Sequence, residues 1–307
     1  MKTDKEILSM HMDAEDTLYF SRELESIKAR SYDIKREDLH ARMVFPVSTE
    51  SAPGTETITY RQYDMVGSAI IVSNDGTDVP RSDVSGKEFS SRVYSIASAY
   101  GWNAKDVRRS RLTGRSLESR RMMAARRALM EKENSLAFNG DAKTGIVGFF
   151  KNPNIPRLAI GTAWASATAD QILADLNAIA DVPSNLTNGI ENASKMFMSI
   201  PLFNLINKKR FTDGSGQTVL SAFLQNNSAI GSVEKLQECK SAADDGGDLI
   251  FAYTPDPEKL QMELPMDMMS HPVREDGDFG WKVVMEEEHG GVNVYYPLSI
   301  VFAVGAG

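Results

Sequence analysis

Residues 116–156 decide the fold, and they read SLESRRMMAARRALMEKENSLAFNGDAKTGIVGFFKNPNIP. Ser116 can cap a helix, and the residues that follow contain neither glycine nor proline before Asn139-Gly140 and are rich in Ala, Leu, Met, Arg and Glu, which favour helix. Asn139-Gly140 is a helix-ending signal. At 1.5 Å of rise per residue, the pattern predicts a helix of about 33 Å over 116–139, long enough to span a whole domain.

Before this helix, the sequence predicts a long β-hairpin over residues 57–97. The first strand, TITYRQYDMVGSAIIVS over 57–73, alternates and ends in a β-branched run, and Asn74-Asp75-Gly76 favours a turn. The stretch SSRVYSIASAYGW over 90–102 is predicted as the returning strand. Because a two-stranded hairpin is at best marginally stable alone in water, we expect it to pack on a partner.

The other segments predict a mixed α+β chain with an N-terminal arm. The first 50 residues or so are polar and lack the apolar mass for a core of their own, so we expect them to lie on a neighbouring subunit. Helices are predicted over 103–114, 170–181 and 218–226, strands over 249–253, 281–287 and 292–304, and a strand leading into a loop over 195–205, while 254–280 is rich in Pro, Asp and Met.

Composition excludes several classes of protein. The chain has 307 residues, 42% of them apolar and 25% charged, which is ordinary for a globular protein of about two domains. One cysteine cannot form an intramolecular disulfide, and no stretch approaches the roughly 20 apolar residues of a membrane span. The start, MKTDKEILSM, lacks the apolar core of a signal peptide. We therefore expect a protein of a reducing compartment with no membrane partner.

The motifs with chemical meaning do not assemble into a reaction site. The stretch 140–148, GDAKTGIVG, departs from the phosphate-loop spacing and follows a helix, so a helix-terminating loop is the better interpretation. The four histidines do not pair at metal-ligand spacing, Cys239 has no histidine nearby, and Glu286-Glu287-Glu288 is best read as a solvated strand end. We expect no catalytic residue, no cofactor and no metal: the chain is predicted not to be an enzyme.

Charge is unevenly distributed along the chain. The net charge is −8, yet residues 105–133 contain ten Lys and Arg against four Asp and Glu. The arginines at 120, 121, 126 and 127 spread around the helix, which argues against a single phosphate-facing stripe. Ion pairing between subunits is the first interpretation, simple solvation with pairs such as Arg127–Glu131 the second, and nucleic-acid contact the third.

The order of elements resembles the major capsid protein of tailed double-stranded DNA bacteriophages, a fold shared with encapsulin shells. TITYRQYDMVGSA leading to DVPRSDV is similar to the extended loop of that family, and residues 116–156 are similar to its long spine helix running into a glycine-rich loop. The resemblance implies an N-terminal arm (1–54), an extended β-hairpin loop (55–97), a peripheral domain (98–164 and 261–307) with its spine helix at 116–139, and an axial α/β domain (165–260).

The function implied by the resemblance is self-assembly through pentamers and hexamers into an icosahedral shell that encloses double-stranded DNA. The partners would be further copies of the chain and weakly, non-specifically bound DNA, with portal, scaffolding or decoration proteins as further candidates. The protein would be found in the virion, after assembly in the host cytoplasm. Two alternatives stay open: an encapsulin-like bacterial nanocompartment shell around a cargo enzyme, and a soluble enzyme with a divergent site.

Seven charged residues are predicted to make contacts between subunits, on the hairpin and on the long helix. Some members of the fold join subunits through Lys–Asn isopeptide bonds, and Lys87 could supply the lysine, although nothing in the sequence identifies its asparagine. The predicted contact residues are Arg61, Asp64, Arg81, Asp83, Lys87, Arg120 and Arg127.

Overall fold

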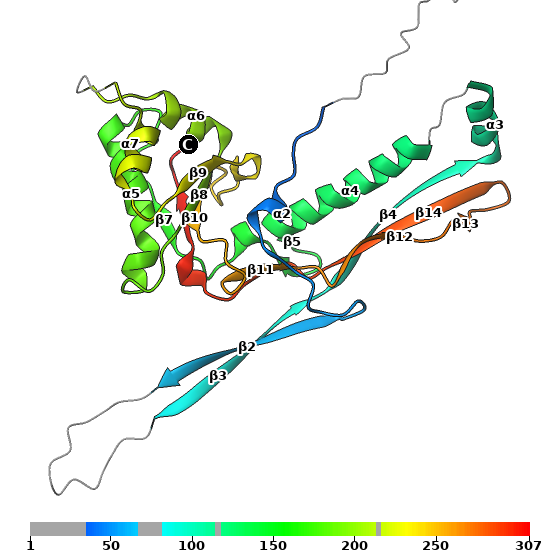
Figure 1. Ribbon diagram of the computed structural model, residues 1–307, viewed down its shortest axis with the longest axis horizontal. Coiled ribbons are helices and arrows are strands. Elements are labelled where there is room, and N and C mark those ends of the chain that lie inside the picture. Colours follow the sequence, from blue (N-terminus) through cyan, green and yellow to red (C-terminus); the bar gives the residue numbers. More distant parts are fainter. Residues whose placement is uncertain (1–34, 67–81, 114–117, 213–215) are drawn as a thin grey trace, which may run out of the picture. The chain divides into compact units, whose positions relative to one another are not determined.

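The computed structural model describes residues 35–66, 82–113, 118–212 and 216–307. The chain divides into two units, Met1–Asp38 and Leu39–Gly307. The helices and strands described below belong to the second unit, and they form the mixed α+β architecture that the sequence predicts (Figure 1).

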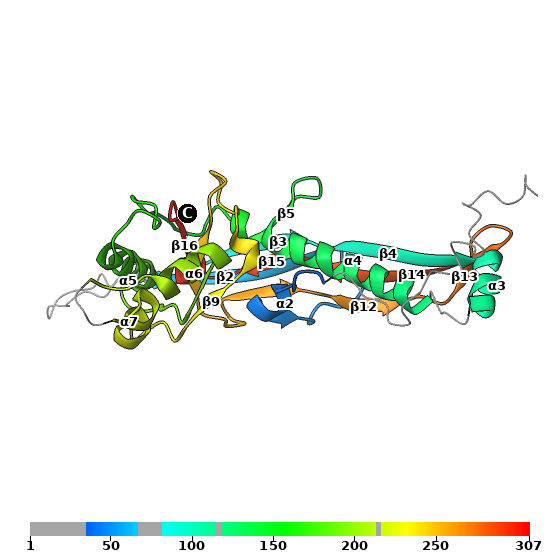
Figure 2. The same ribbon diagram turned by 90° about the horizontal axis from the view of Figure 1, so that it is seen from above.

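The long helix is α4 (Glu118–Phe138), and it lies along a long strand pair (Figure 1 and Figure 2). Strand β4 (Tyr94–Asn103) pairs antiparallel with β14 (Gly280–His289) over its full length, and β12 (Met266–Ser270) and β13 (Arg274–Glu275) also pair with β14. Ala125, Leu129 and Leu136 share one face of α4 and pack with Ile96 of β4 and Met285 of β14. Helix α3 (Ala104–Thr113) follows β4 directly, as predicted.

The hairpin is present, but its returning strand differs from the prediction. Strand β2 (Thr57–Val66) pairs antiparallel with β3 (Asp83–Arg92), so the predicted return over 90–102 is confirmed only as far as Arg92 and is wrong beyond it. The residues from Tyr94 onward form β4 and pair with β14 instead. The physical reason is that Ile96 needs burial, which α4 and β14 supply and a two-stranded hairpin cannot.

A second sheet has the strand order β7–β16–β10–β8–β9 (Arg157–Ala159, Val301–Val304, Ile250–Tyr253, Lys195–Met198 and Ser232–Lys235). Its side chains alternate between two cores. One face packs on helices α5 (Ala169–Leu186), α6 (Ile200–Lys208) and α7 (Val219–Asn226). The other face carries Phe197, Phe251 and Phe302 into a core rich in aromatic rings.

Part of the predicted arm belongs to that aromatic core. Helix α2 (Ala41–Val44) is followed by β1 (Val47–Ser48), which adds parallel to β11 (Leu260–Glu263), and β15 (Val292–Val294) pairs with the other edge of β11. The ring of Phe45 lies 5.0 Å from those of Phe138, at the end of α4, and Phe149, in the turn η1 (Phe149–Lys151). From Ala41 onward the segment packs into a core built by other elements of its own subunit, so the expectation that it lies on a neighbouring subunit is wrong for these residues, whereas residues 1–34 lie outside the described ranges.

Two further predictions need correction, and one segment left without a prediction contains strands. Residues 200–208 are helix α6 rather than a loop, because Ser199 caps the helix and Pro201 fits its first turn. The predicted strand 292–304 is two strands, β15 and β16, separated by the turn η3 (Pro297–Ser299), since proline lacks the amide that a continuous ladder requires. The segment 254–280, for which the sequence predicts no element, contains β11, β12 and β13: β11 pairs with the distant β1, whereas β12 and β13 pair with the nearby β14.

Candidate functional site

The hairpin β2–β3 presents an exposed apolar face, which we call the outer face. Met65 lies opposite Val84, and the ring of Tyr63 lies over Gly86 across the strands. The exposed fractions are 64% for Tyr63, 86% for Met65 and 59% for Val84. Large apolar side chains gathered on one face at this exposure indicate a surface that another molecule covers.

The opposite face of the hairpin is held at its root by the body of the same unit. Tyr60 stacks on Phe89 at 5.3 Å between ring centroids and meets the ring of Tyr295 edge-on at 4.8 Å. Gly290 lies so close to Ile58 that a Cβ on the glycine would come within 3.2 Å of it. The root is thus anchored by aromatic packing, while the outer face has no such cover within the described residues.

The predicted contact residues of the hairpin differ in their surroundings. Arg61 donates to Glu88 across the strands at 2.7 Å, and both side chains are exposed. Asp83 accepts a hydrogen bond from the amide of Val84 at 2.8 Å. Asp64 and Lys87 are exposed and make no polar side-chain contact with other described residues.

Arg81, the fifth predicted contact residue on this segment, lies outside the described ranges. The structure thus places Arg61, Asp64, Asp83 and Lys87 along one exposed hairpin without showing what they contact in another molecule.

The basic residues of the α3–α4 region are partly paired within the subunit. Arg127 donates to Glu131 at 2.8 Å, as the i,i+4 spacing predicts, and Arg120 is exposed. Arg121 joins the end of β4 to α3, because its guanidinium donates to the carbonyl of Gly101 at 2.8 Å and to Asp106 at 3.1 Å. Contact between subunits through Arg120 and Arg127 stays a prediction.

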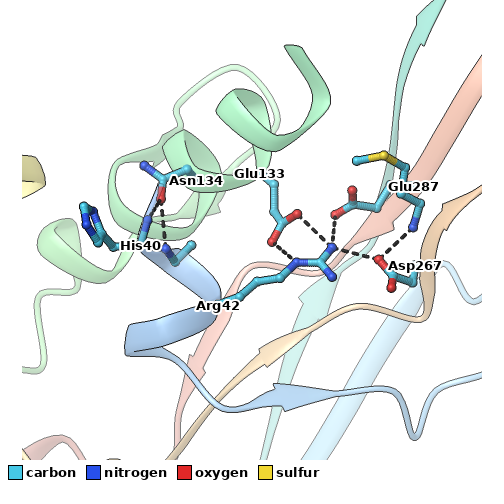
Figure 3. A network of polar contacts seen from close by, with 8 residues as sticks. His40, Arg42, Glu133, Asn134, Asp267 and Glu287 are labelled. Carbon is cyan, nitrogen blue, oxygen red and sulfur yellow. Dashed lines mark hydrogen bonds and ion pairs between the residues drawn. The ribbon is translucent and has the colours of Figure 1, made fainter. Parts of the chain in front are cut away.

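The sequence gives little sign of a polar network around Arg42, which is buried at Glu133 and Glu287 and exposed at Arg42 and Asp267. Arg42 of α2 donates to both carboxylate oxygens of Glu133 on α4, at 2.7 and 2.9 Å, and to Asp267 of β12 at 2.8 Å (Figure 3). The carboxyl of Glu287 on β14 lies 3.8 Å from the same guanidinium. One arginine therefore connects helix α2 to the long helix and to the sheet.

The start of α2 is fixed to α4 by a second contact of this network. The side-chain oxygen of Asn134 accepts from the amides of His40 and Ala41, at 3.1 and 2.9 Å, and so caps α2 in place of a local residue (Figure 3). Its amide nitrogen donates to Glu238 at 2.9 Å. The signal for these contacts was slight, since the partners are about 90 or more residues apart.

Burial strongly alters one titratable group of the network, Glu287, and one close to it on the same strand, His289. Burial, reinforced by the neighbouring Glu133 carboxylate, raises the pKa of Glu287 to about 8. Burial also lowers the pKa of His289, two residues along β14, to about 4. The interpretation of Glu286-Glu287-Glu288 as a solvated strand end is thus wrong for Glu287, which is fully buried.

The motifs tested for chemistry have structural explanations. In GDAKTGIVG, Gly140-Asp141 pairs antiparallel with Ile146-Val147, and Gly140 has a φ of +70°, which favours glycine. Cys239 is fully buried, and burial raises the pKa of its thiol. Among the described residues, no group of three or more His, Cys, Asp or Glu could hold a metal ion. None of the helices in the described ranges is both long and apolar enough to cross a membrane.

Comparison with known proteins identifies a family. The family model described as "Major capsid protein" matches residues 67–305 of this chain. No curated protein matches the chain.

Solved structures share the fold. The capsid of Myoviridae phage XM1 is similar over 95% of this chain and 100% of its own, with a TM-score of 0.82 and 19% identity. The structure of Microbacterium phage Oxtober96 is similar over 93% of this chain and 97% of its own, with a TM-score of 0.64 and 14% identity. The virus-like particle from Pyrococcus furiosus is similar over 88% of this chain and 92% of its own, with a TM-score of 0.54 and 12% identity. At these identities the structures bear on the fold alone.

Proposed function

This chain belongs to the major capsid protein family, and from that premise we propose that its copies assemble, through pentamers and hexamers, into an icosahedral shell that encloses double-stranded DNA. The role is structural rather than catalytic. The virion is its final location, with assembly in the host cytoplasm.

One observation in the structure carries the proposal: the outer face of the hairpin. Tyr63, Met65 and Val84 expose large apolar side chains to solvent, which is unfavourable in an isolated subunit. They lie on a two-stranded sheet, which is only marginally stable by itself. A neighbouring copy that covers this face would stabilise the hairpin and join two subunits. Closed symmetry repeats such a contact many times, so a modest free energy per contact is enough for a stable shell.

The proposed domains follow the same premise. We assign an arm to residues 1–54, an extended loop to 55–97, a peripheral domain to 98–164 and 261–307, and an axial domain to 165–260. Two separate cores support a division into two domains: one forms between α4, β4 and β14, and another between α5, α6, α7 and the β10-centred sheet. Strands β7 and β16, which the assigned bounds give to the peripheral domain, pair within that second sheet.

Contact with DNA is proposed to be weak and non-specific. The chain carries a net charge of −8, which disfavours tight binding to phosphates, and Arg121 and Arg127 of the α3–α4 region bind carboxylates or a carbonyl of the same subunit. Portal, scaffolding and decoration proteins remain candidate partners. The nanocompartment alternative is not proposed, because the matching family model is that of a major capsid protein.

Size-exclusion chromatography with light scattering tests the assembly of the purified full chain. We expect megadalton particles, or pentamers and hexamers that convert to them. A stable monomer or dimer at every protein concentration would contradict the proposal. The variant Met65→Ser, which makes the outer face more polar, should move the population toward the free subunit, whereas Met43→Ser, at an exposed methionine of α2, serves as the matched control.

A further inference from the structure

The face of β14 that packs under α4 changes its chemistry along the strand. Met285, Glu287 and His289 are buried and the residues between them are not, as expected when alternate side chains of a strand point to the same face. Met285 lies in an apolar core with Leu129 of α4. Further along the same face, a carboxyl and an imidazole take the place of apolar side chains, so the interface between helix and sheet contains two titratable groups.

The carboxyl group of Glu287 has no hydrogen-bond partner among the described residues. Both of its oxygens are buried, and so is the partnerless Nε2 of His289. An ionised carboxylate in this position is unfavourable, because no hydrogen bond replaces the water that the group loses on burial. The arrangement therefore suits Glu287 in its protonated form, and burial next to the Glu133 carboxylate accordingly raises the pKa of the group to about 8.

One guanidinium serves the three carboxyl groups of this region. Arg42 donates to both oxygens of Glu133, at 2.7 and 2.9 Å, and to Asp267 at 2.8 Å (Figure 3). Its distance to Glu287 is longer, at 3.8 Å. His289 adds no positive charge near pH 7, because burial lowers its pKa to about 4. When Glu287 ionises, its carboxylate therefore faces that of Glu133 without a cation of its own.

A bulge in β12 helps to place these groups. The register of β12 on β14 shifts so that two residues, Asp267 and Met268, lie opposite Glu287, and a bulge of this kind redirects side chains. Asp267, at the bulge, reaches Arg42. On the other side of β14, Glu287 pairs with Ile96 of β4, which carries no charge. The titratable and charged groups that surround Glu287 in the described ranges are Arg42 on α2, Glu133 on α4, Asp267 on β12 and His289 on β14, with Arg126 of α4 acting on Asp267.

We propose that Glu287 is a proton switch for the packing of α4 on the sheet. With its proton, Glu287 allows this end of α4 to pack against β14. When the proton passes to water, the carboxylates of Glu287 and Glu133 repel each other, and the end of the helix separates from the strand. Helix α2 moves with α4, because Arg42 binds Glu133 and the side chain of Asn134 caps α2. The pH therefore sets how firmly both helices are held to the sheet.

Methionine methyl NMR of the unassembled full chain tests the switch, with a soluble gadolinium chelate that speeds the relaxation of methyl groups within reach of solvent. With a pKa of about 8, the ionised fraction of Glu287 rises from about one tenth at pH 7 to about nine tenths at pH 9. We expect the relaxation enhancement of the Met285 methyl to rise by at least about threefold over this range, while that of Met196, fully buried in the other sheet, stays unchanged. A Met285 methyl that stays protected at pH 9, or that becomes accessible together with Met196 through general unfolding, would overturn the proposal.

Three substitutions separate the switch from other effects of pH. Glu287→Gln keeps the shape of the neutral side chain and has no proton to lose, so the Met285 methyl should stay protected at pH 9. Glu133→Gln removes the opposing carboxylate and leaves ionised Glu287 beside the guanidinium, so the methyl should again stay protected. The matched control is Glu286→Gln, on the opposite face of β14 and bound to His271, which should keep the full pH response.

A pH response that persists in either buried variant, or that is lost in Glu286→Gln, would overturn the proposal. If Glu287→Gln does not fold, Glu133→Gln decides the question by itself. The measurement is made on the unassembled subunit, so its outcome is independent of whether particles form.

Discussion

The substitution Arg42→Met tests whether the polar network around Arg42 holds helix α2 to the long helix. Both carboxylate oxygens of Glu133 accept from this guanidinium, at 2.7 and 2.9 Å, and the Glu133 side chain is 3% exposed. Removing one partner of a buried pair leaves an uncompensated charge and costs about 3–5 kcal/mol. Because the Arg42 side chain is itself 42% exposed, we expect a loss near the lower end, about 3 kcal/mol.

Urea unfolding of the unassembled subunit, followed by tryptophan fluorescence, measures this loss. The matched control is Arg61→Met, which breaks the exposed pair with Glu88, whose side chains are 64% and 60% exposed, and should cost less than about 1 kcal/mol. Adding Glu133→Gln to Arg42→Met removes the stranded charge and should restore part of the stability. Equal losses for the two arginine variants, or no recovery in the double variant, would refute the reasoning.

Three other predictions concern pH, a close backbone contact and the hairpin. The free energy of unfolding should fall by about 2 kcal/mol from pH 6.5 to 8, because Glu287 in the folded protein, with its pKa of about 8, keeps a proton that the unfolded chain has lost. Below pH 6.5, His289 has the opposite effect, because with its pKa of about 4 it stays neutral in the folded protein while the unfolded chain binds a proton. Urea unfolding across this range should show the decline in the parent but not in Glu287→Gln, and a decline that persists there would contradict the assignment. Gly148→Ala should lower the free energy of unfolding by about 3 kcal/mol in the same assay, because its Cβ would lie 2.2 Å from a backbone carbon. The control Gly161→Ala places a Cβ that meets nothing within 4 Å and should raise it by about 0.4–1 kcal/mol. Similar effects of the two substitutions would contradict the clash at Gly148. Asp64→Lys, at an exposed position, should reduce particle yield in sedimentation while changing subunit stability by less than about 0.5 kcal/mol, and the reverse pattern would argue against a contact there.

Local signals in the sequence predict the elements that depend on local physics. The long helix follows from an uninterrupted run of helix-forming residues and a clear end at Asn139-Gly140. The first strand of the hairpin follows from alternation between 57 and 66. The family resemblance also rests on these two stretches, and the family model confirms it over residues 67–305.

The sequence does not indicate which residues far apart in the chain pair with one another. The stretch from Tyr94 has an ordinary strand pattern. It lies outside the hairpin because it pairs with β14, almost 200 residues later in the chain. Arg42 reads as one charge in a polar segment, but three acidic residues from distant elements surround it in the fold. Glu287 reads as one of three solvated carboxylates, yet strand alternation buries it.

Electron cryo-microscopy of particles formed by the purified full chain tests the central claim most directly, because it shows both the assembly and what covers the outer face of the hairpin. The account predicts closed shells in which Tyr63 and Met65 of each subunit contact a neighbouring copy. Lone subunits at high concentration, or shells in which that face remains in solvent, would contradict it.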